Sequence, residues 1–285
     1  MKRSIPSVTI IIVLVLSFVA YVRGQWVPAT SDQLEIHMLD VGQGDAFHIR
    51  TPGGMDIVVD GGPDRSVVSE LGRVMPPTDH TIELMIASHE DADHIAGLTE
   101  LPDTYEIKTL ITSGVASGTN FSDELATWAS DGVEVLQAHQ GWLLHVEEGL
   151  DLLFFHPDPP NFHPDINDDS VVFLLRYRDF SALFTGDAPV EIEEQVLGRF
   201  GDEIAEVDIL KAGHHGSRTS TSRRLLEIMN SQITLISVGK DNTFGHPHAE
   251  VVRRLESFGS AVFRTDEDGP VTCLTNGSDF SCFPR

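Results

Sequence analysis

The chain has 285 residues, of which 41% are hydrophobic and 22% are charged, so it has enough apolar material for one large core or two small ones. This composition excludes a disordered protein. The formal net charge of −25 argues against a broad polyanion-binding surface, because non-specific affinity for nucleic acid comes mainly from Lys and Arg side chains that meet phosphates. A small phosphodiester substrate stays open, since bound divalent cations supply local positive charge.

The first predicted element is a hydrophobic segment at the N-terminus. Lys2 and Arg3 precede an almost uncharged run over residues 5–22. At about 18 residues, this run is longer than most signal-peptide cores and just long enough to cross a bilayer. We therefore predict that residues 1–24 form a membrane anchor or a signal segment. The protein would be exported, either held on the outer face of the cytoplasmic membrane or secreted.

A mixed pattern of strands and helices follows a short linker over residues 25–33. Strands are expected over residues 34–39, 46–51, 55–60, 82–88, 107–111, 133–136, 150–155, 171–177, 181–185, 207–211 and 233–238. Helical periodicity marks residues 65–74, 95–101, 122–130, 191–200, 221–229 and 249–258. This order fits an α/β sandwich of two packed mixed sheets with outer helices, in one domain over residues 34–285.

The two cysteines of the chain lie close together near its C-terminus. Cys273 and Cys282 flank Asn276-Gly277, which is a strong hairpin-turn signal, so they fall on opposite arms of a predicted hairpin. In an oxidising compartment they would form a disulfide. Two free buried thiols are the alternative.

Residues that commonly bind metals gather where predicted strands end. The segment SHEDADHIAG (88–97) follows one apolar strand, TGD (185–187) follows another, and GHHGS (213–217) follows a third. Imidazole and carboxylate groups suit Zn²⁺, Mn²⁺ or Fe²⁺. A solvated acidic loop is the alternative for the first segment, but it leaves His89 and His94 unexplained. The three segments together indicate a metal site.

These motifs resemble those of the metallo-β-lactamase superfamily and, within it, the hydrolase-like domain of the ComEC/Rec2 competence proteins. The resemblance runs from about Leu34 to Phe263. Its further markers are LDVGQGDA (39–46), VVDGG (58–62), NDDSVVFLL (167–175), LKAGHHGSRTSTS (210–222) and SVGKDNTFGHPHAEVVRRL (237–255). It implies the αβ/βα four-layer sandwich of the superfamily.

The resemblance also implies a set of metal ligands, which on the superfamily's motifs are His89, Asp91, Asp93, His94, Asp187 and His214. Asp91 stands where the usual motif has a second histidine, and the middle metal histidine has no evident counterpart near residues 167–170. We expect one tight site from Asp93, His94, Asp187 and His214. A weaker second site would use His89, Asp91 and Asp187. The ion would be Zn²⁺ or Mn²⁺, and the oxygen-rich ligand set favours the harder Mn²⁺.

Other residues near this centre are expected to serve the reaction. The candidate catalytic residues are Asp93, His215 and His246. The candidates for supporting the ligands or contacting substrate are Asp45, Asp60, Ser170, Ser217 and Lys240. For Asp60, a simple turn role is the alternative. Histidines without a partner motif are interpreted as structural or surface residues, namely His48, His80, His139, His145, His156 and His163.

The leading function is that of a metal-dependent hydrolase, a phosphodiesterase or nuclease that acts outside the cytoplasmic membrane. DNA is one candidate substrate, and membrane DNA-uptake proteins are candidate partners. One alternative is hydrolysis of another extracellular ester or amide, such as a phosphocholine ester or a β-lactam. A non-catalytic accessory subunit of a DNA-uptake complex is another alternative.

Overall fold

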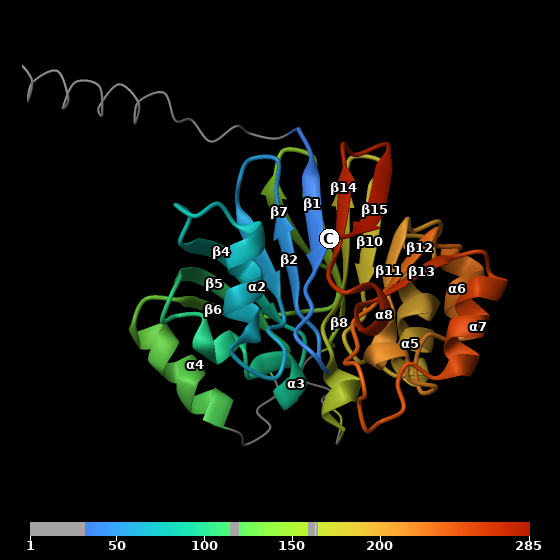
Figure 1. Ribbon diagram of the computed structural model, residues 1–285, viewed down its shortest axis with the longest axis horizontal. Helices are drawn as coiled ribbons and strands as arrows, with labels where there is room; N and C mark the ends of the chain where they lie inside the picture. The colour runs from blue at the N-terminus through green and yellow to red at the C-terminus, as the bar shows by residue number, and fades with distance from the viewer. Residues whose placement is uncertain (1–31, 115–119, 159–162, 164) are drawn as a thin grey trace, which may run out of the picture.

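Two mixed β-sheets face each other across the middle of the molecule, and helices cover their outer sides (Figure 1). The computed structural model describes residues 32–114, 120–158, 163 and 165–285. The predicted N-terminal anchor or signal segment lies outside these residues. Within them, no helix combines the length and the apolar character needed to cross a bilayer.

The first sheet has eight strands within the described residues. In spatial order these are β15 (Phe280–Pro284), β14 (Val271–Thr275), β1 (Leu34–Met38), β2 (Phe47–Arg50), β3 (Asp56–Val59), β4 (Thr81–Ala87), β5 (Glu106–Thr112) and β6 (Glu134–Gln137). Pairing is antiparallel from β15 to β3 and parallel from β3 to β6.

The second sheet repeats this plan with seven strands in the same described ranges. In spatial order these are β13 (Ala261–Arg264), β12 (Ile233–Ile236), β11 (Ile209–Lys211), β10 (Phe180–Phe184), β9 (Val172–Tyr177), β8 (Leu150–His156) and β7 (Trp142–Glu147). Pairing is antiparallel from β7 to β10 and parallel from β10 to β13. Each half of the chain therefore begins with an antiparallel meander and ends with parallel strands.

Helices lie against the outer face of each sheet. Those of the first half are α2 (Ser66–Val74), α3 (Ala92–Ile95), η1 (Leu98–Glu100) and α4 (Asn120–Ser130). Those of the second half are η2 (Ile166–Asp169), α5 (Val190–Phe200), η3 (Gly213–Gly216), α6 (Arg223–Met229), α7 (Ala249–Ser257) and α8 (Thr265–Asp268). Figure 1 shows α2 and α4 on one side of the sandwich and α5, α6 and α7 on the other.

Three layers of buried apolar side chains hold the four structural layers together. Phe47, Phe173 and Phe184 belong to the layer between the two sheets, where their rings contact one another. A second layer, with Leu71 and Leu98, lies between the first sheet and its helices, and a third lies under α5, α6 and α7. Burial of apolar area on both faces of each sheet confirms the predicted α/β four-layer sandwich.

The predicted elements differ from the observed ones in a few places. The helix expected over residues 95–101 is two short pieces, because the Gly97 N–H donates to the Gly62 carbonyl at 2.9 Å. Residue 97 must be glycine, since a Cβ there would lie 1.9 Å from the Gly61 carbonyl oxygen. The edge strands β7 and β13 were not predicted. The C-terminal hairpin was predicted, and it is formed by β14 and β15. Cys273 on β14 forms a disulfide with Cys282 on β15, which confirms the predicted disulfide.

Candidate metal centre

The candidate site is built from loops that leave the ends of strands in both sheets. Asp60 follows β3, the segment from Ser88 to His94 follows β4, Asp187 follows β10, and the His214-His215 pair follows β11. Strand ends of one sheet therefore meet strand ends of the other, so polar groups from distant parts of the chain converge. Figure 1 shows α3, which carries Asp93 and His94, near the point where the two sheets meet.

The backbone of these loops is strained at three site residues. Asp60 has a φ of 55°, His214 of 49° and His215 of 50°, a left-handed region that non-glycine residues seldom adopt. Such strain persists only where the surroundings over-determine it, and it is concentrated at functional sites. The Gly61 N–H donates to the His94 carbonyl at 2.7 Å, and this bond fixes one loop against the other.

The buried imidazoles point their Nε2 atoms at carboxylates. The Nε2 atoms of His89, His94 and His215 are buried and make no hydrogen bond. His94 Nε2 lies 3.4 Å from Asp187 Oδ1, and His215 Nε2 lies 3.5 Å from Asp187 Oδ2. His215 Nε2 is also 3.2 Å from Asp93 Oδ2. The Nε2 atoms of His94 and His215 therefore lie close to the carboxylate oxygens of Asp187.

The opposite ring nitrogen of each of these histidines is held by another group. His94 Nδ1 lies 2.9 Å from Asp60 Oδ2, and His89 Nδ1 lies 3.0 Å from the Ser88 hydroxyl. His215 Nδ1 donates to the Ser237 carbonyl at 2.9 Å. Metal-binding histidines typically have their second nitrogen fixed in this way, which sets the tautomer and the direction of the ring.

The two adjacent histidines of the GHHG segment occupy different positions. His215 is 1% exposed and belongs, with Asp45, His94 and Asp187, to a buried group whose ligand atoms all lie within 4.8 Å of one another. The His214 side chain is 29% exposed at the rim of this group, with Nε2 3.6 Å from Asp187 Oδ2. The structure thus brings both histidines to Asp187, although the sequence indicated only His214 as a ligand.

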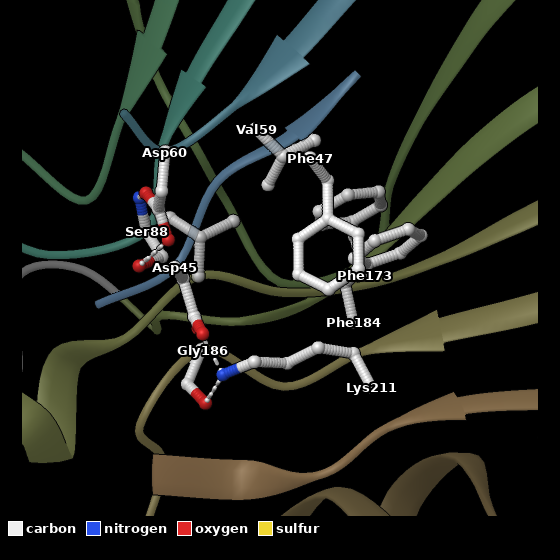
Figure 2. Close-up of a pocket in the computed structure, with 10 residues that line it drawn as sticks. Asp45, Phe47, Val59, Asp60, Ser88, Phe173, Phe184, Gly186 and Lys211 are labelled. Atoms are coloured by element: carbon white, nitrogen blue, oxygen red, sulfur yellow. Dashed lines mark hydrogen bonds and ion pairs between the residues drawn. The ribbon is translucent and has the colours of Figure 1, made fainter. Parts of the chain in front are cut away.

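A buried lysine, Lys211, extends toward Asp45 and Gly186, as Figure 2 shows. Lys211 is 2% exposed, and its Nζ donates to the Gly186 carbonyl at 2.7 Å. The same ammonium pairs with Asp45 and lies 3.5 Å from Asp187 Oδ1. Asp45 in turn approaches His215 Nδ1 at 3.2 Å. Sequence reasoning missed Lys211, for which the one available signal was a lysine that ends an apolar strand just before GHHG.

Burial and the neighbouring charges determine the pKa values of Asp187 and His215. Burial alone would raise the pKa of Asp187, but the charges of His94, His215 and Lys211 hold that pKa well below its usual range. Burial alone would likewise lower the pKa of His215, but the carboxylates of Asp187 and Asp45 raise it to about 10. In the metal-free chain, protons on the imidazoles therefore balance the carboxylates, and a metal ion would displace them.

The residues present fit a divalent cation. Three imidazole Nε2 atoms lack hydrogen bonds, their Nδ1 atoms are fixed, and the carboxylates they face are buried or half-buried. Mixed imidazole and carboxylate donors are those that Zn²⁺ and Mn²⁺ accept. His89 and Asp91 lie beside this group, with Asp91 Oδ2 3.4 Å from His89 Nε2.

The other residues predicted to serve the site lie around it in different ways. The Ser170 hydroxyl accepts from the Asp187 N–H at 3.1 Å, so it holds the loop that carries that ligand. Ser217 is buried and accepts from the Thr219 hydroxyl at 3.0 Å, whereas Lys240 is exposed.

His246 lies close to both histidines of the GHHG segment. Its ring centroid is 5.5 Å from that of His214 and 6.4 Å from that of His215. Burial and these two histidines lower the pKa of His246 to about 4, so it is neutral at pH 7. A neutral imidazole can donate or accept a hydrogen bond, but it cannot supply a proton as imidazolium. The catalytic role of His246 stays a prediction.

A second group of histidines, outside the candidate centre, is fixed by hydrogen bonds. His163 Nδ1 lies 2.9 Å from Asp169 Oδ1, and His156 Nε2 donates to the Asp168 carbonyl at 2.8 Å. These bonds hold the segment before β9. His156, His163 and Asp169 also form a group that could hold a metal ion, so the structural interpretation of both histidines stays a prediction.

The sequence matches the family model of the metallo-beta-lactamase superfamily over residues 39–240. It is 29% identical over 268 residues to ComE operon protein 3 of Bacillus subtilis, a match that covers 86% of this chain and 33% of that protein. It is 32% identical over 242 residues to Recombination protein 2 of Haemophilus influenzae, covering 83% of this chain and 28% of that protein. The chain therefore spans about a third of the length of these relatives.

Solved structures share the fold at low sequence identity. The diiron β-hydroxylase CmlA from Streptomyces venezuelae matches with a TM-score of 0.56 and 13% identity, over 81% of this chain and 52% of that one. Zn²⁺-bound PqqB from Methylobacterium extorquens matches with a TM-score of 0.51 and 12% identity, over 78% of this chain and 85% of that one. These likenesses concern the fold alone.

Proposed function

The chain belongs to the metallo-beta-lactamase superfamily and is related to competence proteins, and on this basis we propose that it is a metal-dependent hydrolase of phosphodiesters. The observation that carries the proposal is the convergence of buried, unbonded imidazole nitrogens on Asp187. A divalent cation would satisfy these nitrogens and carboxylates together, in place of the protons that balance them in the metal-free chain.

In this proposal one tight site is held by His94, Asp187 and His215, with Asp93 and His214 at its rim. His89 and Asp91, together with Asp187, would hold a weaker second ion. Two proteins of similar fold carry different metals, zinc in PqqB and iron in CmlA, so the fold alone does not choose the ion. The mixed imidazole and carboxylate donors suit Mn²⁺ or Zn²⁺, and the carboxylate content favours Mn²⁺.

A divalent cation at this position would lower the pKa of a bound water and polarise the scissile phosphoryl oxygen. The chain's own residues prepare the site for that chemistry. Asp60 turns His94 so that Nε2 faces Asp187, and Ser237 does the same for His215. Lys211 holds the Gly186 carbonyl and balances the carboxylate of Asp45. Ligands fixed in this way need no rearrangement before the reaction.

The phosphodiester class is favoured by relatives that are named Recombination protein 2 and Competence protein ComA. With a net charge of −25, the protein would draw a phosphodiester mainly through its bound cation. We further propose that DNA is the natural substrate and that residues 5–22 hold the protein on the outer face of the cytoplasmic membrane. DNA-uptake proteins in that membrane would be its partners.

A non-catalytic accessory role is the second candidate, and Lys211 is the observation that favours it. Its ammonium lies 3.5 Å from Asp187 Oδ1 and already compensates part of the carboxylate charge that a metal would neutralise. If the Lys211 ammonium already neutralises enough of the carboxylate charge, the site would bind a metal ion weakly.

The test uses the full chain, purified in detergent and stripped of metal. Bis(p-nitrophenyl) phosphate and single-stranded DNA are offered with Mn²⁺, Zn²⁺ or Mg²⁺ restored singly, to the wild type and to Asp187→Asn. We expect hydrolysis to return with at least one ion and to be lost in the variant. Equal hydrolysis by the variant would contradict the proposed centre. A folded wild type that binds metal without hydrolysing either substrate would favour another ester or amide, or the accessory role.

A further inference from the structure

Phe244 has the most exposed large apolar side chain in the described part of the chain, with 63% of its surface accessible. It stands on the loop between β12 and α7. A single exposed phenylalanine is common on protein surfaces and means little by itself. Phe244 differs in the hydrogen bonds that hold its loop and in the rings that it contacts.

The loop that carries Phe244 is held rigid by one side chain. Asn242 Oδ1 accepts from the N–H groups of Phe244 and His246, each at 3.1 Å. Asn242 Nδ2 donates to the carbonyls of Gly239 and His246, at 2.9 and 2.6 Å. The phenyl ring is thus presented to solvent on a preorganised loop, so a ligand that stacks on it pays little ordering cost.

Phe244 is connected to the candidate metal centre by a series of ring contacts. Its ring stacks on that of His246, with 5.9 Å between centroids and 24° between planes. His246 contacts His214 edge to face at 5.5 Å. His214 Nε2 in turn lies 3.6 Å from Asp187 Oδ2. A planar group stacked on Phe244 would therefore be separated from His214, at the rim of the metal centre, by the ring of His246.

The charge of the protein points to the kind of group that this ring would bind. A chain with a net charge of −25 gains little from phosphate contacts, yet base–aromatic stacking does not depend on the charge of the protein. Exposed cations lie at this loop: Lys240 stands on it, and the Arg218 backbone N–H donates to His248 Nδ1 at 3.2 Å. The Arg218 side chain is 65% exposed, and its Nε lies 3.9 Å from Glu250 Oε1. The surroundings therefore offer one aromatic face and nearby cations for a nucleotide unit.

We infer that Phe244, backed by His246, is a stacking platform for a nucleobase next to the phosphodiester at the metal centre. Such a platform takes bases from a single strand, because duplex bases are already stacked on their neighbours. This inference rests on the proposed function and narrows its substrate class to single-stranded nucleic acid. Phe244 then determines specificity and takes no part in the chemistry.

The experiment compares a thymidine oligonucleotide with an abasic oligomer of the same length, which has the same phosphodiesters but no bases. Binding by the full chain is measured first, by fluorescence anisotropy of end-labelled oligomers, and cleavage is measured second. The variants are Phe244→Ala, Phe244→Trp and the control Phe283→Ala, which removes another exposed phenyl ring, on β15.

We expect the wild type to prefer the thymidine oligomer by about 5- to 150-fold, the range that corresponds to one stacked base. Phe244→Ala should lose this preference, while Phe244→Trp and Phe283→Ala keep it. Equal binding of both oligomers by the wild type, or an unchanged preference in Phe244→Ala, would overturn the inference. A preference in binding without cleavage of either oligomer would contradict the hydrolase function and leave the platform supported.

Discussion

Replacing Lys211 by methionine should destabilise the metal-free protein strongly. Lys211, Asp45 and Asp187 are 2%, 1% and 3% exposed, and the ammonium lies against both carboxylates. Methionine nearly fills the space but leaves the carboxylates without their buried counter-ion. Removing one partner of a buried ion pair costs about 3–5 kcal/mol. At about 2–4 °C per kcal/mol for a domain of this size, the melting temperature should fall by about 6–20 °C.

The assay is thermal unfolding of the full chain in detergent with EDTA, followed by circular dichroism. The matched control is Lys108→Met, because Lys108 pairs with Glu106 while both side chains are about half or more exposed. The control should change stability by no more than about 1 kcal/mol. Excess Mn²⁺ should restore more stability to Lys211→Met than to the wild type, because the ion neutralises the same carboxylates. If Lys211→Met lost as little stability as the control, the Lys211 ammonium would not be needed to stabilise the buried carboxylates.

Three further predictions concern protonation, ligand orientation and the disulfide. Because the carboxylates raise the pKa of His215 in the folded protein to about 10, the protonated ring stabilises the metal-free protein fully below about pH 6.5. This stabilisation is lost as the pH rises through about 10. Melting temperatures measured over this pH range check the prediction, and a melting temperature that does not change with pH argues against it. Asp60→Asn should weaken Mn²⁺ binding about 10- to 100-fold while His94 stays in place, which calorimetry measures; an unchanged affinity would show that the Asp60–His94 bond is dispensable. Cys273→Ser should cost about 2–4 kcal/mol under oxidising conditions and little with reductant present, in chemical denaturation; an equal loss in both would indicate packing instead.

The sequence predicted the architecture because its strands have clear apolar or alternating patterns. β7 was missed because it is an edge strand whose residues are half-buried or exposed. Leu143, with 57% of its surface exposed, interrupts the alternation of apolar and polar residues that marks a half-buried strand. The helix expected over residues 95–101 is interrupted where the Gly97 N–H donates to the Gly62 carbonyl, a long-range contact that local periodicity cannot show.

The site was predicted in outline and not in detail, for reasons that lie in the backbone. Motifs at strand ends placed Asp93, His94 and Asp187 in one region. They could not tell which ring of the His214-His215 pair turns inward, because both residues adopt a left-handed φ that no residue pattern announces. Lys211 was hidden for another reason: its carboxylate partners come from other loops, so its role depends wholly on tertiary contacts.

The central claim is that the buried histidines around Asp187 bind a divalent cation. Titration calorimetry of the metal-stripped full chain with Mn²⁺ tests this claim. The variants are His94→Ala, Asp187→Asn and the control His145→Ala, which removes an exposed histidine that pairs with Asp151. We expect about one tightly bound ion per chain in the wild type and the control, and its loss in the two site variants. Tight binding that survives in both His94→Ala and Asp187→Asn would contradict it.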